Sequence, residues 1–159
     1  MSVQRPLEQI LARNLLSSIT TPAFLLGEGG VLLYYNEAAA AMLGRAFEEG
    51  VNLSAREWTQ VFGPLGEDGR PLDYEQLPAV LTVREQRPYH GTFRIRVVDG
   101  GERKVAASAI PVVGLGGSTG AIVFFWPVRE RADEAAQRSA RAWEHRPPDR
   151  RASRNRSGR

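Results

Sequence analysis

The sequence of 159 residues contains no cysteine and only two histidines, His90 and His145. Without thiols the chain forms no disulfide bond, offers no thiolate to a metal ion and has no cysteine nucleophile. The two histidines are too far apart in the sequence for the spacing of a typical metal site. No apolar run approaches the ~20 residues that a membrane-spanning helix needs, and the N-terminus lacks the pattern of a secretory signal. We therefore expect a cytoplasmic protein with one domain.

Arginine is concentrated towards the C-terminus. Residues 129–159 hold ten Arg and five acidic residues, a net charge of +5, whereas residues 1–128 hold 11 basic and 13 acidic residues, a net charge of −2. We predict a linker helix over residues 129–145, with a narrow and mostly small-residue stripe formed by Ala132, Ala136, Ala140 and Trp143. Residues 146–159 show no apolar periodicity, which predicts a disordered basic tail.

Three strands are predicted towards the end of the domain. Residues 93–97 alternate apolar and basic side chains, which is typical of a strand with one buried face, and an Asp-Gly-Gly hairpin turn follows. Residues 104–113 have extended character. The glycine-rich residues 114–120 predict a hairpin loop rather than a phosphate-binding loop, because a strand and not a helix follows them. Residues 121–126 are apolar on both faces, so we expect a central strand covered on both sides.

An amphipathic helix is predicted near the N-terminus, over residues 6–19, because four apolar residues lie at helical spacing: Leu7, Ile10, Leu11 and Leu15. A hairpin follows, with strands at residues 23–26 and 31–35. Asn36 then lies where its side chain can cap a short helix, and Gly44 is suited to end that helix.

Two further helical segments are predicted before the last three strands. Trp58 and Phe62 indicate a short helical turn with aromatic contacts. Asp73 is placed to cap a helix over residues 74–85, with Pro78 in its first turn, where proline is tolerated.

This order of elements resembles the PAS sensory family, and in particular its bacterial members. The resemblance covers residues 10–128 and rests chiefly on the stretches Thr21–Leu26, Val31–Ala39, Asp68–Leu72, Phe93–Arg96 and Gly120–Val123. It implies an α+β fold: a five-stranded antiparallel sheet with helices on one face, plus flanking N- and C-terminal helices. The last strand would lie between the first and the fourth. The resemblance also implies a sensory domain at residues 21–128, and an N-terminal helix within residues 1–20 that covers the outer sheet face or contributes to a dimer.

In such a fold a ligand pocket lies between the inner sheet face and the helices. The side chains predicted to line it are Trp58, Phe62, Leu77, Leu81, Phe93, Ile95, Val97, Val123 and Phe125. A mostly apolar pocket of this kind suits a flat or aliphatic ligand. The alternative is ordinary core packing with no ligand, and aromatic stripes of this kind usually belong to the core.

Cofactors and catalysis receive less support from the sequence. Some PAS relatives hold haem through a histidine on the helix before the third strand, whereas His90 follows that helix and reaches iron only if the helix extends further. The flavin chemistry of the light-sensing subclass needs a cysteine, which is absent, and non-covalent flavin stays open. Ser108 has no histidine close to it in the sequence, so we expect no catalytic activity.

The resemblance therefore implies a signal-transduction module that binds a small ligand or a partner protein. It would form a homodimer and act through its flanking helices on a separate output protein, such as a kinase or a regulator of transcription. The alternative is a dimeric adaptor whose tail binds nucleic acid or an anionic surface through Arg150, Arg151, Arg154, Arg156 and Arg159.

Overall fold

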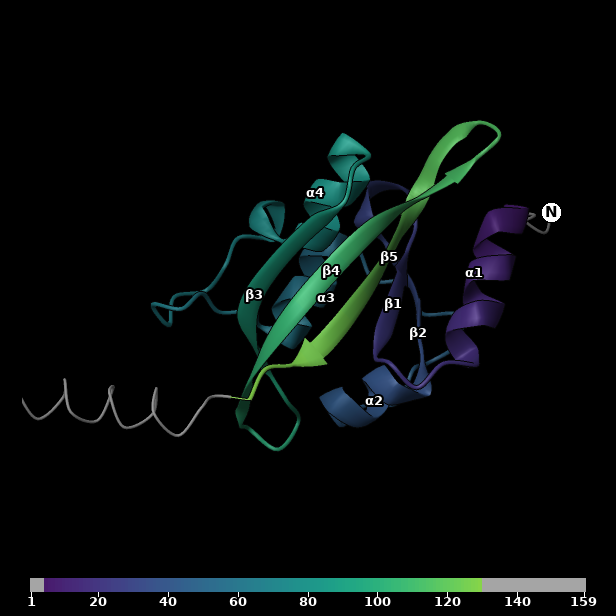
Figure 1. Ribbon diagram of the computed structural model, residues 1–159. Coiled ribbons are helices and arrows are strands. Elements are labelled where there is room, and N and C mark those ends of the chain that lie inside the picture. Colours follow the sequence, from purple (N-terminus) through teal and green to yellow (C-terminus); the bar gives the residue numbers. More distant parts are fainter. Residues whose placement is uncertain (1–4, 130–159) are drawn as a thin grey trace, which may run out of the picture. The chain divides into compact units, whose positions relative to one another are not determined.

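The structure is a computed structural model that describes residues 5–129 of the chain (Figure 1). Its strands are β1 (Ala23–Leu26), β2 (Leu32–Tyr35), β3 (Tyr89–Arg96), β4 (Glu102–Gly114) and β5 (Gly117–Pro127). Its helices are α1 (Leu7–Ser17), α2 (Glu37–Leu43), α3 (Ala55–Phe62) and α4 (Pro78–Glu85). The strands form one antiparallel sheet in the order β2-β1-β5-β4-β3, which confirms the predicted fold class and the central position of the last strand.

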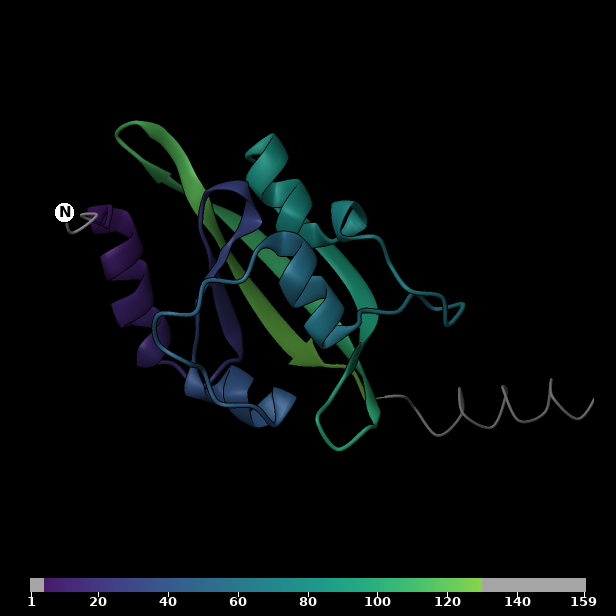
Figure 2. The ribbon, with the colours of Figure 1, turned by 180° about the vertical axis from the view of Figure 1, so that it is seen from behind.

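Strand β5 is buried on both faces because protein lies on both sides of it. Helices α2, α3 and α4 cover one face of the sheet, here called the inner face, and α1 lies against the other, outer face (Figures 1 and 2). On β5, Val123 and Phe125 belong to the inner core, whereas Ile122 packs with the residues under α1. The cover ends before Trp126, which is 47% exposed.

The hairpin between β4 and β5 is longer than the sequence predicts. The glycine-rich residues 114–120 were expected to form a loop, but the ladder continues to the pair Gly114 and Gly117. A register shift between Val112 and Val113 accommodates the extra residue. Gly117 and Gly120 have positive φ angles of 110° and 145°, which glycine adopts without a steric cost, so glycine here permits an irregular strand rather than a loop.

Helix α1 forms as predicted but buries a different face from its most apolar stripe. Ala12 and Leu16 are its buried residues, and they pack against the outer sheet face. The residues that define the predicted stripe are more exposed: Leu7 66%, Ile10 43%, Leu11 58% and Leu15 58%. The helix therefore covers part of the outer face with its narrow side and presents an apolar stripe to its surroundings.

Asn36 caps α2 as predicted and also joins three segments of the chain. Its Oδ1 accepts hydrogen bonds from the backbone N–H groups of Ala39 and Ala23, each at 3.0 Å. Its Nδ2 donates to the carbonyl oxygens of Leu16 at 3.0 Å and Thr21 at 2.8 Å. One buried amide thus fixes the end of α1, the start of β1 and the first turn of α2 relative to one another.

The helix predicted over residues 74–85 begins later than expected. Asp73 caps only a 3₁₀ turn at Tyr74–Gln76, and Leu77 then takes an extended conformation before α4 starts at Pro78. The physical reason is that a residue before proline avoids the helical region. Proline thus separates the turn from the helix instead of lying inside a longer one.

Helix α4 is capped at its C-terminus by Gln86, which adopts the left-handed conformation with φ 57°. Gln86→Gly is expected to raise the free energy of unfolding by about 0.5–1 kcal/mol, because glycine adopts this conformation without a Cβ penalty. Urea denaturation followed by circular dichroism measures the change. As a control, Arg84→Gly inside the helix is expected to lower stability by about 1 kcal/mol. A loss of stability in Gln86→Gly would contradict the prediction.

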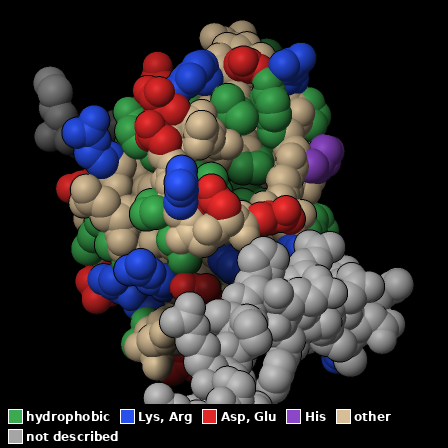
Figure 3. Space-filling model, turned by 90° about the vertical axis from the view of Figure 1, so that its left-hand side faces the viewer, with side chains coloured by type: hydrophobic (Ala, Val, Ile, Leu, Met, Phe, Trp, Pro, Cys, Tyr) green, Lys and Arg blue, Asp and Glu red, His purple; other side chains and the backbone are tan. Residues whose placement is uncertain are grey.

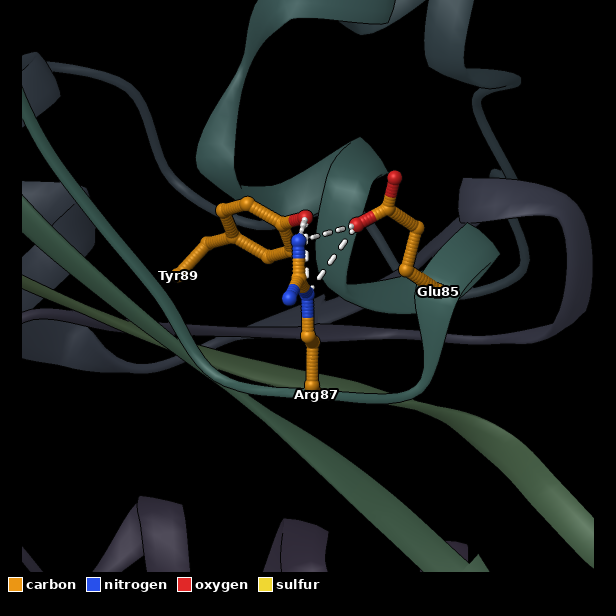
Figure 4. A network of polar contacts seen from close by, with 3 residues as sticks. All are labelled: Glu85, Arg87 and Tyr89. Carbon is orange, nitrogen blue, oxygen red and sulfur yellow. Dashed lines mark hydrogen bonds and ion pairs between the residues drawn. The ribbon is translucent and has the colours of Figure 1, made fainter.

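A polar network holds the connection from α4 to β3 (Figure 4). The Arg87 guanidinium donates to the Tyr89 hydroxyl from Nη2 at 2.6 Å and from Nε at 2.9 Å, and it also donates to the Glu85 carboxylate. Glu85 and Arg87 are exposed and Tyr89 is partly exposed, so the network orients the turn and contributes little to stability.

Candidate functional site

An apolar cavity of about 30 Å³ lies between the inner sheet face and the helices. Seven of the nine predicted pocket residues line it: Trp58, Phe62, Leu77, Phe93, Ile95, Val123 and Phe125. Leu81 and Val97 do not: Leu81 is half-buried on α4 and Val97, although buried, lies past the end of β3. The sequence-based prediction missed seven lining residues, namely Phe24, Met42, Leu43, Pro64, Pro78, Ala79 and Ala107.

Aromatic rings fill most of the space around this cavity. The Phe24 ring lies 4.7 Å from that of Phe125, 5.5 Å from that of Phe62 and 5.6 Å from that of Tyr35, measured between centroids. Phe24 was missed because all four residues of β1 are buried, so the strand has no alternation that would assign a face. Only the pairing of Phe24 with Val123 of β5 places it over the cavity.

The buried polar groups near the cavity are already engaged in the fold. Trp58 Nε1 donates to the Gly30 carbonyl at 2.8 Å, and Thr82 Oγ1 donates to the Ala109 carbonyl at 3.3 Å. Burial raises the pKa of the Tyr35 hydroxyl, which donates to the backbone carbonyls of Arg45 and Ala46. Within the described residues no buried side-chain nitrogen or oxygen lacks a partner, so no polar group is left to orient a ligand in this cavity.

The cavity does not fit haem or flavin in this conformation. Ligand pockets typically measure about 300–1,000 Å³, and about 30 Å³ leaves room for little more than one water molecule. His90 is also placed on the wrong side for a haem ligand, because it is exposed on β3 while Phe93 and Ile95 of the same strand point inward. Helix α4 ends at Glu85, so the condition under which His90 would reach iron is not met.

The structure brings His90 next to Ser108, a pairing that the sequence-based analysis missed. The two residues are opposite each other on β3 and β4, and His90 Nδ1 lies 2.8 Å from Ser108 Oγ. The signal that would have found them is strand register, since they are 18 residues apart. No carboxylate within the described residues orients the imidazole, so the pair lacks the third member of a nucleophilic triad.

The described residues offer neither a metal site nor a visible basic patch. Among residues 5–129, no group of three or more His, Asp or Glu side chains is arranged to hold a metal ion. On the face seen in Figure 3, basic and acidic side chains are interspersed, so the visible described surface carries no extended basic patch for nucleic acid. None of the helices in the described range has the length and apolar character to cross a bilayer. The predicted linker helix with Ala132, Ala136, Ala140 and Trp143, and the arginine-rich tail, lie outside the described residues.

The sheet order, the central β5 and the helices over one face are shared with solved structures of PAS domains. The chain has the PAS fold. The PAS domain of a protein from Colwellia psychrerythraea matches with a TM-score of 0.56 and 16% identity, over 77% of this chain and 99% of that one. The PAS domain of Bordetella pertussis BvgS matches with a TM-score of 0.52 and 16% identity, over 85% of this chain and 96% of that one.

A third PAS domain, from the nitrogen regulation protein NR(II) of Vibrio parahaemolyticus, matches with a TM-score of 0.52 and 14% identity. That match covers 74% of this chain and 98% of the other. No family model and no curated protein matches the sequence. The likeness therefore establishes the PAS fold.

Proposed function

We propose that this PAS domain is a non-catalytic signal-transduction module. The observation that supports the proposal is the position of β5, the strand through which the two sides of the sheet are connected. Val123 and Phe125 line the inner cavity, whereas the residues that precede them, Ile122 and Phe124, pack in the cluster under α1. In the sequence, residues 129–145, the predicted linker, follow soon after β5. A shift of β5 would thus move both flanking segments together.

The signal is a small ligand or contact with a partner protein. The inner cavity is too small for a ligand as it stands, so a ligand enters only if the rings around Phe24 and Phe125 move apart. A ligand would then select an expanded conformation and shift the population towards it. Native mass spectrometry and an absorption spectrum of the purified full chain test this directly. A retained small molecule supports ligand binding, whereas an empty protein supports a partner-driven signal.

The proposed module acts as a homodimer on a separate output protein. The exposed Leu7, Leu11 and Leu15 on α1 supply apolar surface that a second copy would cover. The predicted stripe with Ala136 would supply a second contact and carry the signal to the output protein, for which a kinase or a regulator of transcription is proposed. The PAS domain of a nitrogen regulation protein offers a parallel for such a role.

Because the chain has no cysteine, Ala136→Cys creates a unique site for disulfide cross-linking. In a homodimer that meets along the predicted stripe, this variant is expected to cross-link. Adding Phe125→Leu, which alters the packing around the cavity, is expected to change the cross-linking yield by roughly twofold or more. Thr92→Ala, on the exposed side of β3, is the matched control and should leave the yield unchanged. Equal yields in all three proteins would contradict signal transfer through β5.

A further inference from the structure

A second cavity lies on the opposite side of the sheet, between α1 and the strands β1 and β2. Its volume is about 140 Å³, considerably more than that of the inner cavity. The strands supply an apolar floor of Leu25, Leu33 and Tyr34. The N-terminal segment supplies the other wall, which consists of Arg5, Gln9, Ile10, Arg13 and Asn14. Figure 1 shows α1 alongside these two strands.

The charged residues that line this cavity, Arg5 and Arg13, are both positive. The Arg13 guanidinium lies over the Tyr34 ring, 4.6 Å from its centroid, and forms an ion pair with Glu49. This hydrogen bond from Arg13 holds the pKa of the Glu49 carboxyl below its usual range, and the charge of Arg5 acts in the same direction. Arg5 and Arg13 therefore both interact electrostatically with the single carboxylate of Glu49. Arg5 forms no hydrogen bond or ion pair with any other described residue, so its charge is not matched by a partner of its own.

The other two polar side chains of the wall are Gln9, which is hydrogen-bonded within the described part of the protein, and Asn14, which is not. Gln9 Nε2 donates to the Thr119 carbonyl at 3.0 Å and thereby fastens α1 to the hairpin of β4 and β5. The Asn14 side-chain amide has no hydrogen-bond partner among the described residues, and it supplies two further donors. A site with unpaired donors, surplus positive charge and no carboxylate in its lining favours an anion.

We propose that this outer cavity binds a small organic carboxylate whose apolar body is about the size of one ring. The carboxylate pairs with Arg5 and Asn14, and the ring rests on Leu25, Leu33 and Tyr34. The size follows from the volume, since an apolar cavity of roughly 150 Å³ admits benzene. The site is separate from the inner cavity and does not depend on the proposed signalling role. Its ligand would bridge α1 and the sheet.

Benzoate is the probe that tests the proposal, in an NMR titration of the full-length protein. Saturable shifts are expected at the amides of Leu25, Leu33 and Tyr34, with a Kd of roughly 0.1–1 mM for a ligand of this size. Benzyl alcohol lacks the charge and acetate lacks the ring, so both should bind more weakly. Shifts confined to Phe93 and Phe125 of the inner cavity, equal binding of benzyl alcohol, or no saturable binding would each overturn the proposal.

Three variants distinguish the contribution of the Arg5 charge to binding from that of the apolar residues on the strands. Arg5→Gln should weaken benzoate binding by roughly tenfold or more, because a charge-assisted hydrogen bond is lost at an exposed residue whose replacement leaves the fold intact. Leu33→Trp fills the cavity and should abolish binding, with the NMR spectrum reporting whether the variant is folded. Arg70→Gln removes the same charge from an exposed loop and should change the affinity by less than about twofold. Equal affinities for Arg5→Gln and Arg70→Gln would overturn the assignment of Arg5.

Discussion

Asn36→Ala is expected to lower the free energy of unfolding by about 3–5 kcal/mol. The change removes the cap of α2, which is worth about 1 kcal/mol. It also leaves the buried N–H of Ala23 and the carbonyls of Leu16 and Thr21 without their partner, at about 1–3 kcal/mol each where water does not enter. Urea denaturation followed by tryptophan fluorescence, to which the buried Trp58 contributes, measures the loss.

Two companion variants identify the source of that loss. Asn36→Asp keeps both accepting interactions but removes the two donated hydrogen bonds, so it should be destabilised as well, and a stability equal to the parent protein would mean that those bonds contribute nothing. Asn52→Ala is the matched control, because Asn52 is exposed and its replacement is expected to matter by less than about 0.5 kcal/mol. An Asn36→Ala variant as stable as Asn52→Ala would contradict the role given to the buried amide.

Gly120→Ala is expected to be comparably damaging, at about 3–5 kcal/mol. A Cβ atom at this position would lie 1.9 Å from the carbonyl oxygen of Leu26 and 2.8 Å from its carbonyl carbon. The φ angle of 145° also disfavours any residue with a side chain. The clashing atoms belong to the backbone of Leu26, which cannot change rotamer as a side chain can. Strands β1 and β5 would therefore have to separate, and the hydrogen bonds between them would be weakened.

Gly116→Ala, in the same hairpin, controls for the loss of glycine as such. A Cβ there meets no atom within 4 Å, so stability should change by less than about 0.5 kcal/mol. Chemical denaturation of both variants under identical conditions gives the comparison. Equal stabilities would show that the approach of β5 to Leu26 is not a constraint on the fold.

Much of the fold was predictable because hydrophobic patterning and local capping agree with the tertiary structure. The unbroken apolar run at residues 121–126 predicted a central strand, and Asn36 predicted a helix start, and both are confirmed. The prediction was wrong where the backbone properties of proline and glycine outweigh the hydrophobic pattern. Pro78 delays α4, and the glycines after Val113 extend a hairpin instead of ending it.

The site was less predictable, since its composition depends on contacts between distant segments. The prediction found the lining residues that come from alternating strands and from α3, such as Phe93 and Trp58. It missed Phe24, which lies in a strand without alternation, and the pairing of His90 with Ser108, which depends on register. The volume of the inner cavity also depends on how the rings interlock, a property that no single segment encodes.

The burial of β5 on both faces restricts how this chain can diverge. Strand β3 alternates buried and more exposed positions, so mutations to polar residues are tolerable at every second site. Polar residues are not tolerable at any position of residues 121–125, because consecutive side chains pack into different hydrophobic clusters on the two sides of the sheet. Among chains of common descent, drift should therefore be slowest along this short stretch, and any change there would require compensation on the side of the sheet that the altered side chain faces.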